Sequence, residues 1–571
     1  MPASLLVSVG WAIAIVAVLL VLLRLRAPLW TCVLPLVLFA WPQWTSAWAT
    51  YWHGFMHSSM VYEIVERGVP PQNPLMVGEP LRYMYGHHAL IAWIMHLIPI
   101  SPPQAFALTD AICLVLFAIA IERTAALVSA DRVFRVMAVV IAFAAFTPFS
   151  FDVVRAAIAR VTELEVEWRF IPLTKFGGIN DNQVGWVLFA TAILGVARLA
   201  AGHPRRRGAY VLIALAIVLS GYMYPPAWLG IMACAGLAAL YFLSRGAPLR
   251  RTGVALLVLL AVGAALTAPY IYVLTAGKSP GAAVHLVPPM WLLRQHVENL
   301  VLFLAVPALL ALGARRALVA AWRRQPHLAT VLALGAAITM FMYTMMEIPS
   351  RSEYKMLGMS VIVLSVPVTM ALYDLYQRHR AIAVGVLVLV LVPVADTFGR
   401  AWVHDPVSDP VVSDGRWLRH TDPAQDSLYT WISGSTPVDA LFVDSYLTIP
   451  VLGRRQLLVG LDVRRESGGL AHVMHDGWLI TAHQFLQSTT GVPAGKFTAL
   501  RSAALALESA TPDSAVSERT FAVVERYRMG RPVYVVARTD AVRARLDSVP
   551  VLRPAYRGSA ATVYRYVPRG G

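Results

Sequence analysis

The chain has 571 residues, of which 58% are hydrophobic and only 14% are charged. With a mean hydropathy of +0.61, this composition lies outside the range of soluble globular proteins and indicates a polytopic membrane protein. The net charge of +16 is typical of basic cytoplasmic loops, so it does not indicate a nucleic-acid partner. The cysteines Cys32, Cys113 and Cys234 show neither CxxC nor CxxH spacing, so neither a disulfide framework nor a thiolate metal site is indicated.

Apolar runs long enough to cross a bilayer follow one another through residues 1–398. The sequence predicts about twelve spanning helices there. They lie at 5–23, 29–48, 104–127, 134–149, 184–200, 209–223, 226–243, 252–273, 298–313, 327–346, 356–373 and 381–396. The run from His88 to Ile100 is too short to span, and we expect a half-inserted helix there.

Arginine-rich turns fall on alternate connections between these runs, as a single cytoplasmic face requires. They contain Arg24, Arg26, Arg123, Arg135, Arg205, Arg206, Arg207, Arg245, Arg250, Arg251, Arg315, Arg324, Arg378 and Arg380. The other connections, including outer loops at 50–103 and 150–183, are then on the non-cytoplasmic face.

The long apolar runs stop after Asp396. Beyond it, short β-rich runs such as ALFVDSYL and RPVYVVART alternate with helical patterns. The expected fold class is therefore an all-α polytopic membrane domain at 1–398, followed by a soluble extracytoplasmic α/β domain at 399–571.

The first outer loop begins with histidines at helical spacing. His53, His57 and Ile64 recur on one face of a predicted interfacial helix that ends at Gly68. Two histidines at i,i+4 can bind a divalent metal with His87 or a glutamate as third ligand, or they can anchor the helix at headgroup depth. Both interpretations stay open at this point.

Two carboxylates share the same predicted helix. Glu63 or Glu66 can act as a general base towards an acceptor hydroxyl if an apolar surrounding raises its pKa. The alternative is that both carboxylates pair with Arg67 on a solvated face.

Oxygen-bearing side chains end the second outer loop, directly before a predicted membrane helix. Asn180, Asp181 and Asn182 follow a Gly-Gly turn there. Such residues can cap the helix, or they can supply hard ligands to Mg or Mn.

Basic residues near the outer ends of the later helices form a further set. Lys278, Arg294, Arg351 and Lys355, with Glu353 among them, suit a lipid-linked phosphate at headgroup depth. Simple attraction to anionic lipid headgroups would need the same residues.

Over roughly Ala47 to Arg400 this layout resembles the GT-C superfamily of membrane glycosyltransferases, which take a sugar from a polyprenyl-phosphate carrier on the non-cytoplasmic side. In that family an acidic residue precedes a histidine, a helix ends in glycine, and a proline turn follows. His57, Gly68 and the Pro70-Pro71 turn fit this order, whereas His53 stands near the acidic position.

Other segments carry the same resemblance. GGINDNQVGW is similar to the second-loop segment of oligosaccharyltransferase catalytic subunits, which implies a metal-ligand role for Asp181 and Asn182. SEYKM, and WISGSTPVDALF from Trp431 to Phe442, resemble large uncharacterised bacterial relatives. The resemblance implies the bacterial cytoplasmic membrane as the location. It also implies that Arg82, Arg351 and Lys355 bind the donor phosphate.

Two functions follow as hypotheses. The first is an inverting hexosyl or pentosyl transfer from a polyprenyl-phosphate sugar to a glycan, lipid or protein acceptor, with Glu63, His53 and His57 as catalytic residues and Mg or Mn as a candidate cofactor. The second is a noncatalytic or transporting protein that handles lipid-linked or polymeric glycans. A catalyst should gather its polar groups at the outer surface, whereas a transporter should place them near the midplane.

Overall fold

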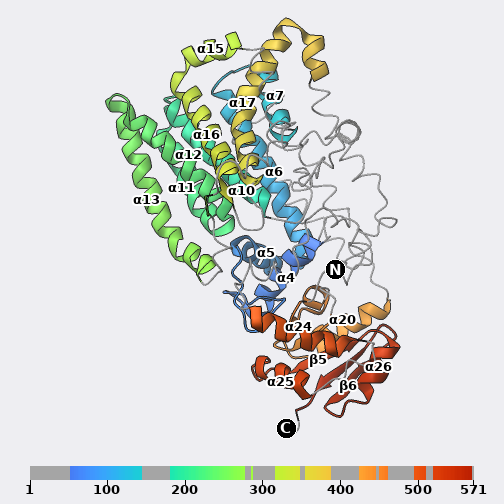
Figure 1. Cartoon of the computed structure of the whole chain (residues 1–571). Coiled ribbons are helices and arrows are strands. Elements are labelled where there is room, and N and C mark those ends of the chain that lie inside the picture. The colour runs from blue at the N-terminus through green and yellow to red at the C-terminus, as the bar shows by residue number, and fades with distance from the viewer. Residues whose placement is uncertain are drawn as a thin grey trace, which may run out of the picture. The chain divides into compact units, whose positions relative to one another are not determined.

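The computed structural model describes residues 52–144, 181–276, 285–286, 315–347, 354–386, 423–444, 449–460, 494–509 and 518–568. The chain folds into two compact units. The first comprises Met1–Thr45, Phe106–Val273 and Val284–Val403, and the second comprises Ser46–Ala105, Leu274–Ala283 and His404–Gly571. Figure 1 shows the described helices and strands in chain order.

The first unit consists mainly of helices. In chain order they are α6 (Pro102–Ala126), α7 (Arg132–Ala144), α10 (Asn182–Ala200), α11 (Arg206–Met223), α12 (Pro225–Leu243), α13 (Ala247–Thr275), α15 (Arg315–Arg324), α16 (Pro326–Met345) and α17 (Tyr354–Arg378). A short antiparallel pair joins β1 (His285–Leu286) to β2 (Met346–Glu347). Within the described ranges, 7 helices are long and apolar enough to cross a membrane. The chain is thus a multi-pass membrane protein.

The predicted spans between 104 and 373 that fall on described residues coincide with helices α6, α7, α10, α11, α12, α13, α16 and α17. The predicted spans at 5–23, 29–48 and 298–313, and most of 381–396, lie outside the described residues. A total of about twelve spans therefore stays a prediction.

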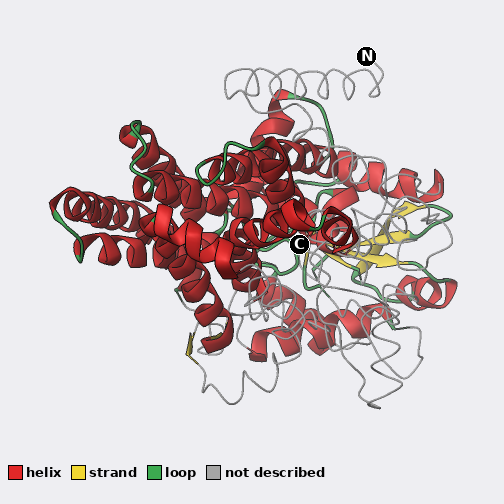
Figure 2. Ribbon diagram, turned by 90° about the horizontal axis from the view of Figure 1, so that it is seen from above, coloured by secondary structure: helices red, strands yellow, loops and turns green. Residues whose placement is uncertain are grey.

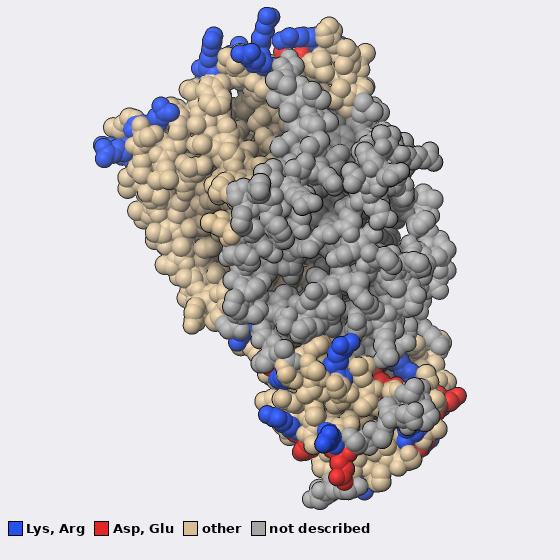
Figure 3. All heavy atoms as spheres, viewed as in Figure 1, with Lys and Arg blue, Asp and Glu red and all other residues tan. Residues whose placement is uncertain are grey.

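Helix α10 forms the core of the first unit because it packs against α11, α12, α16 and α17. Its tryptophan and phenylalanine side chains, Trp186 and Phe189, are fully buried. Small residues let the helices approach closely: a Cβ added at Gly230 of α12 would lie 2.4 Å from the sulfur of Met359 in α17. In this unit the Lys and Arg side chains on the visible face gather at one end of the helices, and the apolar band beside them is uncharged (Figure 3). This distribution is the one expected of helices that cross a bilayer.

The second unit combines the first outer loop with the C-terminal part of the chain. Its helices are α4 (Trp52–Arg67), α5 (Gly86–Leu97), α20 (Pro423–Ser435), the π-helical η6 (Ile449–Gly453), α24 (Ala494–Glu508), α25 (Glu518–Tyr527) and α26 (Asp540–Asp547). Helix α5 has 12 residues, too few to span a bilayer. Its half-insertion stays a prediction.

A five-stranded sheet forms the core of this unit, with strand order β4-β3-β5-β7-β6. The strands are β3 (Leu441–Val443), β4 (Gln456–Leu457), β5 (Val533–Ala537), β6 (Leu552–Arg557) and β7 (Thr562–Tyr566). Strands β4, β3 and β5 are parallel, and β7 and β6 continue antiparallel. Figure 2 shows these strands side by side with helices packed around them. The predicted strands in ALFVDSYL and RPVYVVART are β3 and β5, so the small α/β fold is confirmed.

The first outer loop pairs with the edge of this sheet. The Leu457 amide donates to Pro74 O over 2.9 Å, the Gly460 amide donates to Leu75 O over 2.6 Å, and Met76 bridges Val459. The side chains of Leu75, Met76, Val77 and Leu81 join the buried core of the sheet. The loop therefore covers a strand edge that would otherwise expose unpaired backbone groups. The structure groups this loop with the C-terminal strands in one unit. The predicted domain boundary after residue 398 stays a prediction.

Candidate functional site

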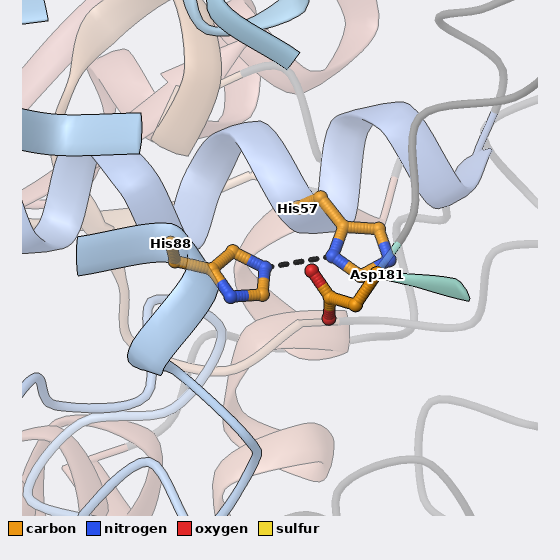
Figure 4. A group of neighbouring side chains, drawn as sticks. All are labelled: His57, His88 and Asp181. Atoms are coloured by element: carbon orange, nitrogen blue, oxygen red, sulfur yellow. Dashed lines mark hydrogen bonds between the residues drawn. The ribbon is translucent and has the colours of Figure 1, made fainter. Parts of the chain in front are cut away.

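Two buried polar clusters stand out, one in each unit. The first lies between α4 and α5, where the two histidine side chains face one another. His57 Nδ1 and His88 Nε2 are 2.7 Å apart, and the rings stack with centroids 4.9 Å apart (Figure 4). Their exposed fractions are 2% and 0%. Neutral imidazoles at this distance share a proton as donor and acceptor.

The chain between the two helices brings these histidines together. Gly68 adopts φ +86°, a left-handed conformation that favours glycine and ends α4. The extended segment after it returns the chain to α5, as the proline turn predicts. Tyr83 in this segment makes edge contacts with both rings, at centroid distances of 6.1 Å to His57 and 6.1 Å to His88. Aromatic packing therefore fixes the pair.

The sequence suggested His87 as the histidine that joins His57, but the structure places His88 there. His88 faces His57, whereas the ring centroid of His87 lies 6.4 Å from that of His88. His53 belongs to the first turn of α4, and its side chain lies outside the described part of the structure.

Glu63 lies on α4 within an ion-pair network. The carboxylate pairs with Arg67, four residues later, and is 1% exposed. Arg67 also donates to Val438 O over 2.5 Å. Burial raises the pKa of Glu63 to about 6, against the opposing charges of Arg67 and Arg531. Of the two carboxylates expected to pair with Arg67 on a solvated face, Glu63 makes this pair, but its carboxylate is buried and Arg67 is only partly exposed.

Glu66, the second carboxylate of α4, takes part in a separate contact. It lies 3.8 Å from the guanidinium of Arg454, whose Cζ is 4.9 Å from the Tyr62 ring centroid. Glu66 therefore ties this helix to the C-terminal part of the second unit.

The second polar cluster lies in the first unit, around the start of α10. Tyr224, fully buried between α11 and α12, donates its hydroxyl to Asn182 Oδ1. Lys355, near the start of α17, places Nζ 5.1 Å from the centroid of the same ring and is 8% exposed. Three segments distant in sequence thus meet at one tyrosine. The ammonium over the ring face is a cation–π contact.

Gly185 permits this arrangement. A Cβ at that position would lie 2.0 Å from Cδ1 of Tyr224, so only glycine lets the ring lie against α10. Asp181 directly precedes the helix, is 1% exposed, and makes no side-chain cap hydrogen bond to it. Capping therefore does not account for this carboxylate.

Two further predicted donor-binding residues can be located in part. Arg82 lies half-buried in the segment before α5. Arg351 lies outside the described residues, so its predicted role stays untested.

Sequence reasoning missed His88 and Tyr224 as parts of these clusters. His88 is adjacent to His87 and on the same short helix, and only packing distinguishes the two. Tyr224 belongs to the GYMYPP turn. A tyrosine directly before a Pro-Pro helix start is a signal that could have drawn attention to it.

The sequence matches no protein-family model and no curated protein. Among solved structures, arabinofuranosyltransferase AftD from Mycobacteria aligns with 90% of this chain and 39% of its own, at a TM-score of 0.51 and 16% identity. The chain has a GT-C fold. ArnT from Cupriavidus metallidurans bound to undecaprenyl phosphate aligns with 94% of this chain and 98% of its own, at a TM-score of 0.47 and 14% identity. Archaeal oligosaccharyltransferase AglB from Archaeoglobus fulgidus aligns with 95% of this chain and 74% of its own, at a TM-score of 0.38 and 11% identity.

Proposed function

We propose that the protein is a membrane glycosyltransferase that moves a sugar from a polyprenyl-phosphate-linked donor to an acceptor on the non-cytoplasmic face. The observation that carries this proposal is the likeness of its fold to that of an arabinofuranosyltransferase. An acceptor hydroxyl or amide attacks the anomeric carbon, its proton passes to a base, and the bond to the carrier phosphate breaks with inversion. The buried polar clusters support a catalyst, because they supply basic and proton-transferring groups.

Lys355 is the residue that we propose for the departing phosphate, with Arg82 and Arg351 as further donor-binding residues. The Tyr224 ring and the hydrogen bond from Tyr224 to Asn182 hold the ammonium and the start of α10 in one place. A fixed cation costs no reorganisation when negative charge develops on the leaving group. The helix start adds backbone N–H groups that favour an anion.

In this proposal, the base that accepts the proton of the acceptor is Glu63 or His57. His53 is a further predicted catalytic residue. A pKa of about 6 keeps Glu63 mostly ionised at neutral pH and close to the value that suits a general base. Its pairing with Arg67 competes with that role. His57 is already within proton-sharing distance of His88.

A divalent metal is a further part of the proposal. Imidazole nitrogens suit transition metals, and two of them on one tetrahedral zinc ion lie about 3.3 Å apart. The pair His57 and His88, at 2.7 Å, fits a hydrogen bond directly and needs a small opening to fit an ion. From the sequence, we propose that the Asp181 carboxylate and the Asn182 amide contribute oxygen ligands to this metal.

The test is sugar transfer by the purified full-length protein from a panel of radiolabelled polyprenyl-phosphate sugars, with and without EDTA. We expect Lys355→Met to raise the donor KM and lower kcat, and Lys355→Arg to restore part of both. Glu63→Gln should abolish turnover if Glu63 is the base, and Glu66→Gln, a partly exposed carboxylate of the same helix, is its matched control.

Replacement of the histidines decides between the proton-sharing and metal roles. If the pair holds a metal, EDTA should inactivate the wild type, and His57→Ala and His88→Ala should lose activity. If the pair moves protons, the same variants should lose activity, but EDTA should leave the wild type active. Tight donor binding with no transfer or hydrolysis from any donor would contradict the proposed enzyme and favour a noncatalytic or transporting protein.

A further inference from the structure

A group of arginines lies at the ends of α6, α7 and α10, where the proposed transfer reaction does not use it. Arg123 is in the last turn of α6, Arg135 is in the first turn of α7, and Arg198 is in the last turn of α10. Arg135 Nη1 donates to Glu122 Oε1 over 2.8 Å, and Arg123 Nε lies 3.3 Å from Glu122 Oε2. Arg198 lies within electrostatic range of Arg123.

Positive charge exceeds negative charge in this group. Within the described ranges, Glu122 is the one carboxylate at ion-pair distance from these arginines, and it is fully buried. The carboxylate of Asp131, which accepts from the amides of Val133 and Phe134 over 2.7 Å and 3.2 Å, adds a second negative charge that acts on Arg135. Arg205 adds a further positive charge close to Arg198. Arginines held together in this way repel one another unless an anion joins them.

Some guanidinium donors of the group are buried without an acceptor. Arg123 Nη2 and Arg135 Nε have no hydrogen-bond partner in the part of the chain that the structure describes, and both atoms are inaccessible. The side chains as a whole are 23% exposed, so the group lies near the surface although these donors are covered. Buried charged donors require acceptors, which bound oxygen atoms supply.

We propose that Arg123, Arg135 and Arg198 bind the phosphate of an anionic phospholipid headgroup. The planar guanidinium pairs with phosphate through two parallel N–H bonds. Basic sites between membrane helices at headgroup depth select anionic lipids in this way. The site is independent of Lys355 and the start of α10, because Arg198 is sixteen residues along that helix from Asn182, or about 24 Å.

Native mass spectrometry of the full-length protein in detergent tests the proposal, with equal amounts of phosphatidylglycerol and phosphatidylcholine. The wild type should retain phosphatidylglycerol preferentially. The double substitution Arg123→Gln/Arg135→Gln should reduce this retention about tenfold, because it removes charge-assisted hydrogen bonds. The matched control is Arg206→Gln/Arg207→Gln, which removes the same charge from exposed arginines and should leave retention unchanged.

A substitution of opposite effect separates binding from damage to the fold. Glu122→Gln removes the competing carboxylate and should increase retention, whereas misfolding would lower it. If the double variant is not monodisperse, Arg135→Lys replaces it, since a lysine keeps the charge but loses the fork.

Inorganic phosphate forms the second arm and identifies the source of the phosphate. If the wild type binds millimolar phosphate and retains no lipid, the arginines bind a soluble anion, and the proposal of a lipid ligand is overturned. Equal retention of both lipids by the wild type, or equal losses in the two double variants, would overturn the site itself.

Discussion

Substitution of Met76 by alanine should open the sheet edge that the first outer loop covers. Met76 is fully buried in the core of the second unit and bridges Val459 beside β4. Truncation of a buried methionine to alanine costs about 2 to 5 kcal/mol. Because β4 has only two residues, we expect this loss to be concentrated in the pairing of the loop with the strand.

Hydrogen–deuterium exchange of the peptide that covers β4 measures this opening. Each 1.4 kcal/mol corresponds to a tenfold change in an equilibrium constant, so a loss of 2 kcal/mol should accelerate exchange at the Leu457 and Gly460 amides about 30-fold. Val438→Ala is the control, since that valine is 42% exposed. A change below about threefold in Met76→Ala, or an equal change in the control, would refute the view that the loop is part of the sheet's core.

Two other substitutions test the Glu63–Arg67 pair and the contact of α10 with Tyr224. Glu63 has a pKa raised from 4.5 to about 6 by burial, so the native state binds more protons than the unfolded state between these values. Stability should therefore fall by about 2 kcal/mol as pH rises through this window. Thermal unfolding between pH 4 and 7 should show this dependence in the wild type but not in Glu63→Gln, and its persistence in the variant would assign it to another group. Gly185→Ala should cost about 1 to 3 kcal/mol through overpacking against Tyr224. Gly236→Ala, where the nearest atom is 4.0 Å away, should be tolerated, and equal unfolding temperatures would show that the ring can move.

Local pattern was sufficient for the helices and for part of the sheet. Apolar length predicted the positions of α6, α10, α12 and α16, because a segment of this length with so few charges has few alternatives to a buried helix. Short runs of β-branched and aromatic residues predicted β3 and β5, whose side chains are buried. The two-residue strand β4 is too short to produce such a pattern.

The candidate site was predictable only as a set of segments. The sequence placed His57 at the outer loop, Asn182 at a helix start and Lys355 near a helix end. It could not distinguish His88 from His87, since adjacent residues of a helix differ only in the direction in which they point. Nor could it pair Tyr224 with Asn182 and Lys355, which are far apart in the chain.

The sequence by itself determined that this is a multi-pass helical membrane protein with a C-terminal α/β fold, because length and hydrophobicity act locally along the chain. Only the tertiary structure decided that the first outer loop completes the C-terminal sheet and that Glu63 is buried against Arg67. It also decided that Tyr224 supports Lys355. These outcomes depend on contacts between residues distant in sequence, where the packing of specific side chains selects one partner from many of similar chemistry.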